Sequence, residues 1–198
     1  GVIVAVGGSG TILTSSDGIT WTARTSENSN GLKGVTYAND IFMGVGGDGT
    51  VLTSPDGINW TSKSITTSVS LNGITFGNNT FVAVGNANNC SPCAGSIFSS
   101  SDNGTSWDNR TPGTWSTPPQ NIINRVTFGN NTFVAGSWGA TSGTIFTSSD
   151  NGTSWDNSTS VYKRDLRDIA YGESTFVTVG AYGSDGVILT SSDNGTSW

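Results

Sequence analysis

The side chains of this sequence that could do chemistry are mostly aspartates, and they recur in one kind of segment. A row of repeated acidic turns suggests metal binding or catalysis, and paired carboxylates could hydrolyse glycosidic bonds. Each segment has a serine, an aspartate two residues later, a glycine and then a tryptophan; we call the five segments the box turns, 15–21, 54–60, 100–107, 148–155 and 191–198. Their aspartates are Asp17, Asp56, Asp102, Asp150 and Asp193, and their tryptophans are Trp21, Trp60, Trp107, Trp155 and Trp198.

The order of residues in the box turns favours structure over catalysis. An aspartate carboxylate accepts hydrogen bonds from backbone N–H groups two or three residues on, and glycine takes a positive φ without steric cost. The tryptophan that follows is large and apolar, so it suits packing between sheets. We therefore expect each box turn to connect two strands, with its carboxylate occupied by the turn itself.

The pattern Ser-x-Asp-x-Gly-x-x-Trp resembles the Asp-box, or BNR repeat, of sialidases and many other β-propellers. The last three copies match it fully, whereas 15–21 and 54–60 have one residue fewer between aspartate and glycine. The chain resembles the Asp-box repeats of secreted bacterial and archaeal proteins. The resemblance implies a β-propeller in which these turns are structural.

The elements between the box turns repeat a four-strand unit. The first strand of the unit is expected at 32–37, 71–76, 123–128 and 166–171, and the second, after an Asn- or Gly-rich turn, at 42–46, 81–85, 133–136 and 176–180. The third is expected at 50–53, 96–99, 144–147 and 187–190, and the fourth begins at the box tryptophan. A four-stranded unit of about 40–45 residues is typical of a propeller blade. Few strong helix formers are present, so we expect almost no helix.

The repeats predict the domain organisation. We expect one all-β propeller over 1–198 with antiparallel blades in approximate repeats 1–31, 32–70, 71–122, 123–165 and 166–198. The first repeat lacks its first strand and the last lacks most of its fourth. Five blades are favoured, and the alternative is a fragment of a six- or seven-bladed propeller.

Composition excludes several classes of partner. The net charge is −6 and no basic run occurs, so nucleic acid is a poor candidate. No apolar stretch is long enough to cross a membrane. The chain has no histidine, and we expect neither a metal nor a cofactor. The resemblance favours a secreted or cell-surface protein. A disulfide between Cys90 and Cys93, which is discussed below, would favour the same location.

The connections between second and third strands, and those between blades, are expected on one face, opposite the box turns. These loops differ between repeats, and loops on a rigid scaffold commonly carry binding sites. The candidate ligand-binding residues are Trp115, Trp138, Tyr182 and Arg167. Aromatic and polar side chains suit a carbohydrate or a peptide; alternatively, the tryptophans cover neighbouring loops or form a subunit contact.

A second candidate on this face is a set of polar residues at equivalent positions of the first strands: Lys33, Asn72, Asn124 and Arg167. They are expected near the mouth of the central channel. Such residues are either solvated charges or a site for an acidic ligand.

Two further sets of residues concern covalent modification. Cys90 and Cys93 offer too few ligands for a closed zinc site, and a local disulfide is the better interpretation. N-glycosylation sequons occur at Asn59, Asn78, Asn89, Asn103, Asn109, Asn130, Asn151, Asn157 and Asn194. We expect them on exposed turns.

The sequence argues against an enzyme. Without histidine, Ser-His-Asp and Cys-His systems are excluded. Sialidase chemistry needs three converging arginines, yet Arg24 and Arg110 fall on outer strands, and only Arg125 and Arg167 on inner ones. We expect a binding or structural module with a protein or glycan partner at the variable-loop face, or self-association into a larger assembly. A lectin-like propeller is the alternative, and a glycoside hydrolase is less favoured.

Overall fold

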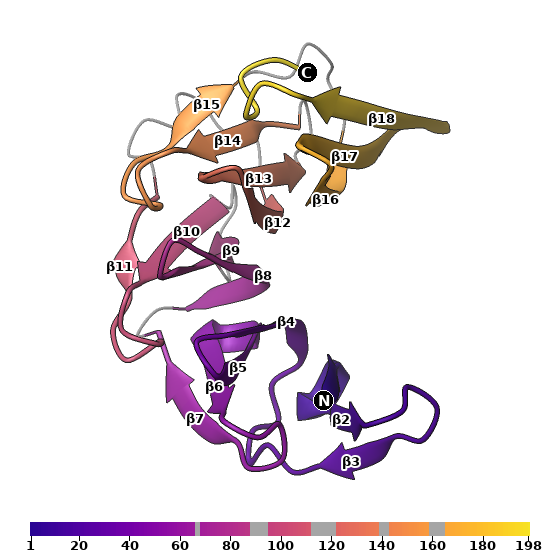
Figure 1. Cartoon of the computed structure of the whole chain (residues 1–198), viewed down its shortest axis with the longest axis vertical. Helices are drawn as coiled ribbons and strands as arrows, with labels where there is room; N and C mark the ends of the chain where they lie inside the picture. The colour runs from indigo at the N-terminus through magenta and orange to yellow at the C-terminus, as the bar shows by residue number, and fades with distance from the viewer. Residues whose placement is uncertain (66–67, 88–94, 112–121, 139–142, 159–164) are drawn as a thin grey trace.

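The computed structural model describes residues 1–65, 68–87, 95–111, 122–138, 143–158 and 165–198. Its strands form five separate antiparallel sheets of three or four strands, as blades of a β-propeller. Figure 1 shows the blades side by side in an arc, with the first strand of each complete blade on the concave inner edge. The predicted all-β propeller with five blades is confirmed, and the first and last sheets form the two ends of the arc.

The strands follow one order in every blade. Blade 1 contains β1 (Ile3–Val6), β2 (Ile12–Ser15) and β3 (Thr22–Arg24), and blade 2 contains β4 (Leu32–Ala38), β5 (Ile41–Gly46), β6 (Thr50–Ser54) and β7 (Thr61–Ser64). Blade 3 contains β8 (Val69–Gly77), β9 (Thr80–Ala87), β10 (Gly95–Ser100) and β11 (Asp108–Asn109). Blade 4 contains β12 (Ile122–Gly129), β13 (Thr132–Trp138), β14 (Ile145–Ser148) and β15 (Asp156–Ser158). Blade 5 contains β16 (Asp165–Gly172), β17 (Thr175–Tyr182) and β18 (Asp185–Ser191).

Two details differ from the expectations. The outer strands begin one residue after the box tryptophan. Three of the tryptophans donate their indole N–H to the carbonyl of the box glycine and so belong to the turn. Two three-residue 3-10 turns, η1 (Gly8–Gly10) and η2 (Gly47–Gly49), are the only helical segments in the described residues. Neither of these helical segments is long and apolar enough to span a membrane.

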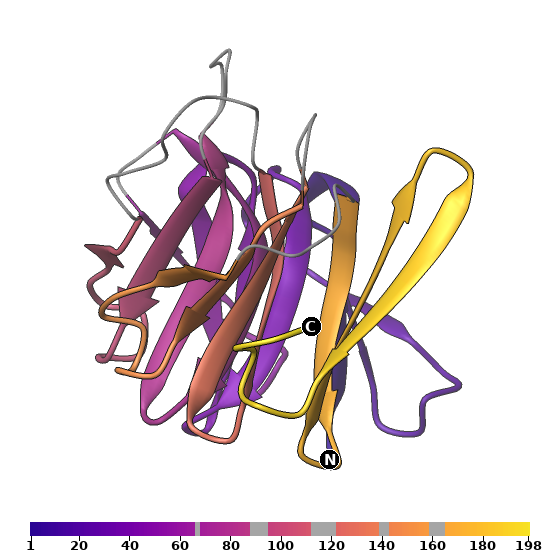
Figure 2. The ribbon, with the colours of Figure 1, turned by 90° about the horizontal axis from the view of Figure 1, so that it is seen from above.

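The strand registers define two ends of the propeller. Phe81, at the start of β9, pairs with both Phe76 of β8 and Ser100 of β10, so the inner hairpin turn and the box turn lie at the same end. The opposite end carries the connections between second and third strands and those between blades. We call the two ends the box-turn end and the loop end; Figure 2 shows the strands running between them.

The core lies between the blades rather than within them. The junction of blades 3 and 4 buries Val82, Val84 and Ile97 from one blade against residues of the next, such as Phe133 and Phe146. The other three junctions contain equivalent clusters. Alternate side chains of a strand point to opposite faces of its sheet, so each interior blade contributes to two junctions.

At the junctions of blades 3–4 and 4–5, close contact depends on glycine after the inner strand's aromatic residue. A Cβ at Gly77 would lie 2.2 Å from the ring of Phe128, and a Cβ at Gly129 would lie 2.1 Å from that of Tyr171. Each ring also packs on the first phenylalanine of its second strand, with centroids 4.7 Å apart for Phe128 and Phe133. These glycines therefore set the distance between neighbouring blades.

Candidate functional site

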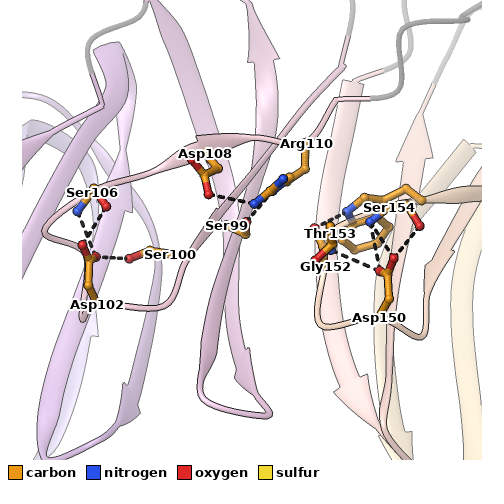
Figure 3. A network of polar contacts seen from close by, with 11 residues as sticks. Ser99, Ser100, Asp102, Ser106, Asp108, Arg110, Asp150, Gly152, Thr153 and Ser154 are labelled. Carbon is orange, nitrogen blue, oxygen red and sulfur yellow. Dashed lines mark hydrogen bonds and ion pairs between the residues drawn. The ribbon is translucent and has the colours of Figure 1, made fainter.

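The box carboxylates are occupied by their own turns. In the fourth copy, Asp150 accepts hydrogen bonds from the hydroxyls of Ser148 and Ser154 and from the N–H groups of Thr153 and Ser154. Figure 3 shows Asp102 and Asp150 bound in the same way in neighbouring blades. In the shorter copies the carboxylate also accepts from two backbone N–H groups, which for Asp17 are those of Ile19 and Thr20. Little acceptor capacity remains for a ligand.

These hydrogen bonds hold the carboxylates in the charged state. The Ser106 hydroxyl and N–H lower the pKa of Asp102 from 3.8 to about 2, and Ser197 does the same for Asp193. The N–H groups of Thr20 and Ile19 lower the pKa of Asp17 to about 2. A general acid needs a raised pKa, so these groups are poorly suited to proton donation.

Box glycines and tryptophans complete the turns. The five glycines have φ between 75° and 80°, a region that favours glycine. A Cβ at Gly104 would lie 2.8 Å from Met43 of the preceding blade, so the turn also packs across a junction. The indole of Trp155 donates to the carbonyl of Gly152, whereas the buried Nε1 of Trp107 has no acceptor in the described part of the chain.

The extra asparagine of the three longer box turns has a role that the sequence analysis missed. Its side chain accepts a hydrogen bond from a turn asparagine of the preceding blade, at 2.6–3.1 Å, in the pairs Asn39–Asn103, Asn78–Asn151 and Asn130–Asn194. The sequence did contain a signal for these pairs, because each blade that precedes a longer box turn has an asparagine in the turn between its first and second strands. The box-turn end is thus held together both within and between blades.

The inner edge of the arc at the loop end is different. Each inner strand has a β-bulge, where the register shifts at Leu32/Gly34, Leu71/Gly73, Ile123/Arg125 and Leu166/Asp168. The bulged residues are the equivalent positions found from the sequence, Lys33, Asn72, Asn124 and Arg167. Arg125 and Asp168 directly follow the bulged residues of blades 4 and 5. Together with the four bulged residues they form what we call the inner polar row: Lys33, Asn72, Asn124, Arg125, Arg167 and Asp168.

Side chains of the inner polar row connect neighbouring inner strands. Lys33 Nζ donates to Ser70 Oγ at 2.6 Å and to Asn72 Oδ1 at 2.9 Å. Asn72 Nδ2 donates to the carbonyl of Ile123, and Arg125 Nη1 donates back to the carbonyl of Asn72 at 2.7 Å.

The row continues into the last blade. Asn124 Nδ2 donates to the carbonyl of Leu166, and Arg125 Nε lies 3.7 Å from Asp168 Oδ1. The contacts therefore run across four inner strands, β4, β8, β12 and β16, which Figure 1 shows side by side.

The row concentrates positive charge in an acidic protein. It holds three cations and one carboxylate, whereas the whole chain carries −6. Burial, and then the charge of Arg125, lower the pKa of Lys33. Arg167 is exposed and, among the described residues, has neither a hydrogen bond nor an ion pair. The row therefore offers positive charge on three of its four strands.

The other predicted ligand-binding residues are described only in part. Trp138 ends β13 at the loop end and is 46% exposed. Tyr182 ends β17 at the same end, but its side chain lies outside the described residues, as does Trp115. The structure thus places Trp138 and Arg167 at one end without a contact that joins them.

The residues predicted to be modified are also described in part. The described sequon side chains are exposed; they are Asn59, Asn78, Asn103, Asn109, Asn130, Asn151 and Asn194. Asn89 and the side chain of Asn157 lie outside the described residues. So do Cys90 and Cys93, and their disulfide remains a prediction.

The residues compared with sialidase chemistry lie apart. Arg24 is on the outer strand β3 and donates to Thr14, and Arg110 follows β11 and binds Asp108 at 2.7 Å (Figure 3). Arg125 and Arg167 are on inner strands. The described arginines therefore do not converge on one point.

Comparisons with known proteins support the fold. No protein-family model and no curated protein sequence matches this chain. Solved structures do match, and they include the protein YCF48 bound to a D1 peptide, with a TM-score of 0.68 and 18% identity over 98% of this chain and 62% of that one. A chain of a nidogen/laminin complex gives a TM-score of 0.68 at 10% identity, over 90% of this chain and 67% of the other.

An enzyme is among the matches as well. The GH74 enzyme of Niastella koreensis gives a TM-score of 0.60 at 19% identity, over 99% of this chain but 29% of its own. The chain spans 52% and 62% of the first two structures that it matches. At these identities the likeness establishes the β-propeller fold, and function has to be argued from this chain's own residues.

Proposed function

We propose that this chain is a non-catalytic binding module whose partner is an acidic segment of a protein, bound at the inner polar row. The observation that carries the proposal is that Lys33, Arg125 and Arg167 all lie at the loop end of inner strands, on β4, β12 and β16. Like charges repel, so the three cations of the row disfavour folding, and a bound anion would offset that cost.

The geometry of the row suits a carboxylate-rich partner. Lys33 is already partly desolvated, and an anion beside it would offset the cost that lowers its pKa. Arg167 offers an exposed guanidinium with no partner among the described residues, and a guanidinium can bind a carboxylate in a bidentate manner. The backbone bulges hold these side chains on a rigid sheet edge, so little ordering is needed on binding.

Two of the structural matches lend support by analogy. The YCF48 match is described as bound to a D1 peptide, and the nidogen match as part of a complex with laminin. Both matches thus come from structures that also contain a peptide or protein partner. The acidic character of the partner rests on this chain's residues alone.

The test is binding of two fluorescent peptides, an Asp-Ser repeat and the matched Asn-Ser repeat, measured by anisotropy. We expect the acidic peptide to bind and the neutral one not to. Lys33→Met and Arg167→Gln should each weaken binding about fivefold or more, since a charge-assisted hydrogen bond contributes about 1.5–3 kcal/mol or somewhat less when exposed. Added salt should weaken binding further.

The matched control is Lys63→Gln, which removes one positive charge from the outer strand β7, where Lys63 donates to Thr105. It should leave the affinity unchanged. Equal binding of both peptides, or an equal loss in the Lys63 variant, would show that net charge rather than the row governs binding.

A carbohydrate is the second candidate ligand, and the exposure of Trp138 favours it. An indole at the loop end can stack on a sugar ring. A glycan array would identify the sugar, and Trp138→Ala should abolish that signal while leaving peptide binding intact. If no glycan binds, the lectin-like proposal fails and the acidic-partner proposal stands.

The non-catalytic character and the location are further parts of the proposal. Purified protein should not hydrolyse any polysaccharide; turnover that is lost in Asp168→Asn would contradict this. We also propose that the box turns are Asp-box repeats and that the protein is secreted or on the cell surface. Detection of the protein in the medium or on intact cells by antibody would test the location.

A further inference from the structure

One nitrogen of the Arg125 guanidinium is committed to the backbone. Arg125 Nη1 donates to the carbonyl of Asn72 at 2.7 Å and to the carbonyl of Asn124 at 2.9 Å. A guanidinium has N–H donors on Nε and on both terminal nitrogens. Because Nη1 is used by two carbonyls, a carboxylate that binds Arg125 in a bidentate manner has to approach the edge formed by Nε and Nη2. We call this edge the open edge of Arg125.

Asp168, the one carboxylate of the inner polar row, lies at this open edge. Its Oδ1 is 3.7 Å from Arg125 Nε, which makes an ion pair that is too long for a hydrogen bond. The side chains of Arg125 and Asp168 are 44% and 65% exposed, so a ligand can reach both. Asp168 is thus the only described residue beside the atoms that a partner's carboxylate would need.

The position of the Asp168 carboxylate does not depend on Arg125. Asp168 Oδ1 accepts a hydrogen bond from the N–H of Ile169 at 2.9 Å, and the Asp168 carbonyl accepts one from the Thr178 hydroxyl at 2.9 Å. The β-bulge between Leu166 and Asp168 shifts the register at this point of β16. The strand itself therefore holds a negative charge beside the open edge, where it repels an incoming anion.

We infer that Asp168 is a specificity-determining residue of the inner polar row: it competes with the partner for the open edge of Arg125, so the row selects clustered carboxylates over isolated ones. The inference rests on the acidic-partner proposal and adds the pattern of acidic residues to it. A single carboxylate at Arg125 loses to Asp168 much of what it gains from the guanidinium. A segment with several carboxylates also meets Lys33, which donates to the same Asn72 that Arg125 contacts. It meets Arg167 as well, and so binds in spite of the competition.

The variant that tests the inference is Asp168→Asn. It removes the charge, and the amide oxygen can still accept from the N–H of Ile169, so the strand keeps its structure. An exposed ion pair changes affinity by roughly two- to fivefold. We expect a gain of about fivefold for a peptide with one Asp in the Asn-Ser repeat. The gain for the Asp-Ser repeat should be nearer twofold, because that peptide has other cations to bind.

Binding of the fluorescent Asp-Ser repeat is measured by anisotropy, and the single-Asp peptide is measured by its displacement of that probe. The matched control is Asp156→Asn, which removes the same charge from an exposed position on the outer strand β15. It should leave both dissociation constants nearly unchanged.

A double-mutant cycle separates competition at the open edge from a general effect of charge. In an Arg125→Gln background no guanidinium edge is left to be freed, so Asp168→Asn should bring little or no gain for the Asp-Ser repeat. An equal gain with and without Arg125 would overturn the inference, and so would a gain no larger than that of Asp156→Asn. In both cases the acidic-partner proposal stands.

The remaining outcomes tell the two proposals apart. If neither the wild type nor Asp168→Asn binds the Asp-Ser repeat, the acidic-partner proposal fails and the inference fails with it. If only Asp168→Asn binds, the competitor role is supported, and the wild-type partner has to be more acidic than this peptide.

Discussion

The box-turn end and the loop end of this propeller use similar polar residues to opposite effect. At the box-turn end, a carboxylate such as Asp150 is satisfied within four residues of the chain, and Ser148 and Ser154 are satisfied with it. At the loop end, Lys33 and Arg125 find partners on a neighbouring strand. Polar groups whose partners lie a few residues away give the same structure in every repeat, as in the box turns. Polar groups whose partners lie in another blade, as in the inner polar row, can differ from one blade to the next and can form a binding surface.

The largest expected effect comes from protonating all five box turns together. The pKa values of Asp17, Asp102, Asp150 and Asp193 fall from 3.8 to about 2 on folding, and that of Asp56 falls as well. A lowered carboxyl pKa stabilises the fold above the unfolded value and ceases to do so as pH falls toward the folded one. We expect the melting temperature to drop steeply between pH 4 and pH 2.

Calorimetry or circular dichroism across that range checks this prediction. In Asp102→Asn one of the five groups no longer titrates, so the drop should become shallower. A melting temperature that does not change between these two pH values would show that the box carboxylates do not couple folding to pH.

The next largest effect is a substitution at a blade junction of the box-turn end. Gly129→Ala places a Cβ 2.1 Å from the ring of Tyr171, so the two blades must move apart. We expect a loss of roughly 1–3 kcal/mol in the free energy of unfolding, measured in urea. Gly172→Ala is the control at the equivalent place in blade 5, where a Cβ meets nothing within 4 Å, and it should change stability by less than about 0.5 kcal/mol. Equal losses would mean that the backbone, not the ring, requires glycine.

A smaller effect is expected from the asparagine pair Asn130–Asn194, which joins two blades at 2.6 Å. Replacing either residue by alanine should cost about 0.5–1.5 kcal/mol of unfolding free energy. In a double-mutant cycle the two losses should be less than additive, because each variant breaks the same hydrogen bond. Strict additivity would show that the pair does not interact in solution.

The smallest effect on stability is expected at the loop end. Arg167→Gln removes an exposed side chain with no partner among the described residues, so the free energy of unfolding should stay within about 0.5 kcal/mol of the wild type. Acidic-peptide binding should weaken in the same variant. A large loss of stability would show that Arg167 stabilises the fold, and the contrast between the two ends would then be weaker.

Much of the architecture was predictable because its causes are local. The alternation of apolar residues and the turn sequences located the strands, and the box pattern predicted which loops share an end. The interblade asparagine pairs were not predicted, since their partners are 64–73 residues apart in the chain. The bulges were recognised only as equivalent positions, because one extra residue in a strand is visible only against its partner strand.

By itself, the sequence determined the repeat, the all-β class and the occupied state of the box carboxylates, because each depends on residues a few positions apart. Tertiary structure decided which side chains meet across strands: it brought Lys33, Arg125 and Arg167 to one inner edge and joined neighbouring blades through pairs such as Asn130–Asn194. Those contacts depend on how whole blades pack, and blade packing is the sum of many weak apolar contacts between residues far apart in the chain.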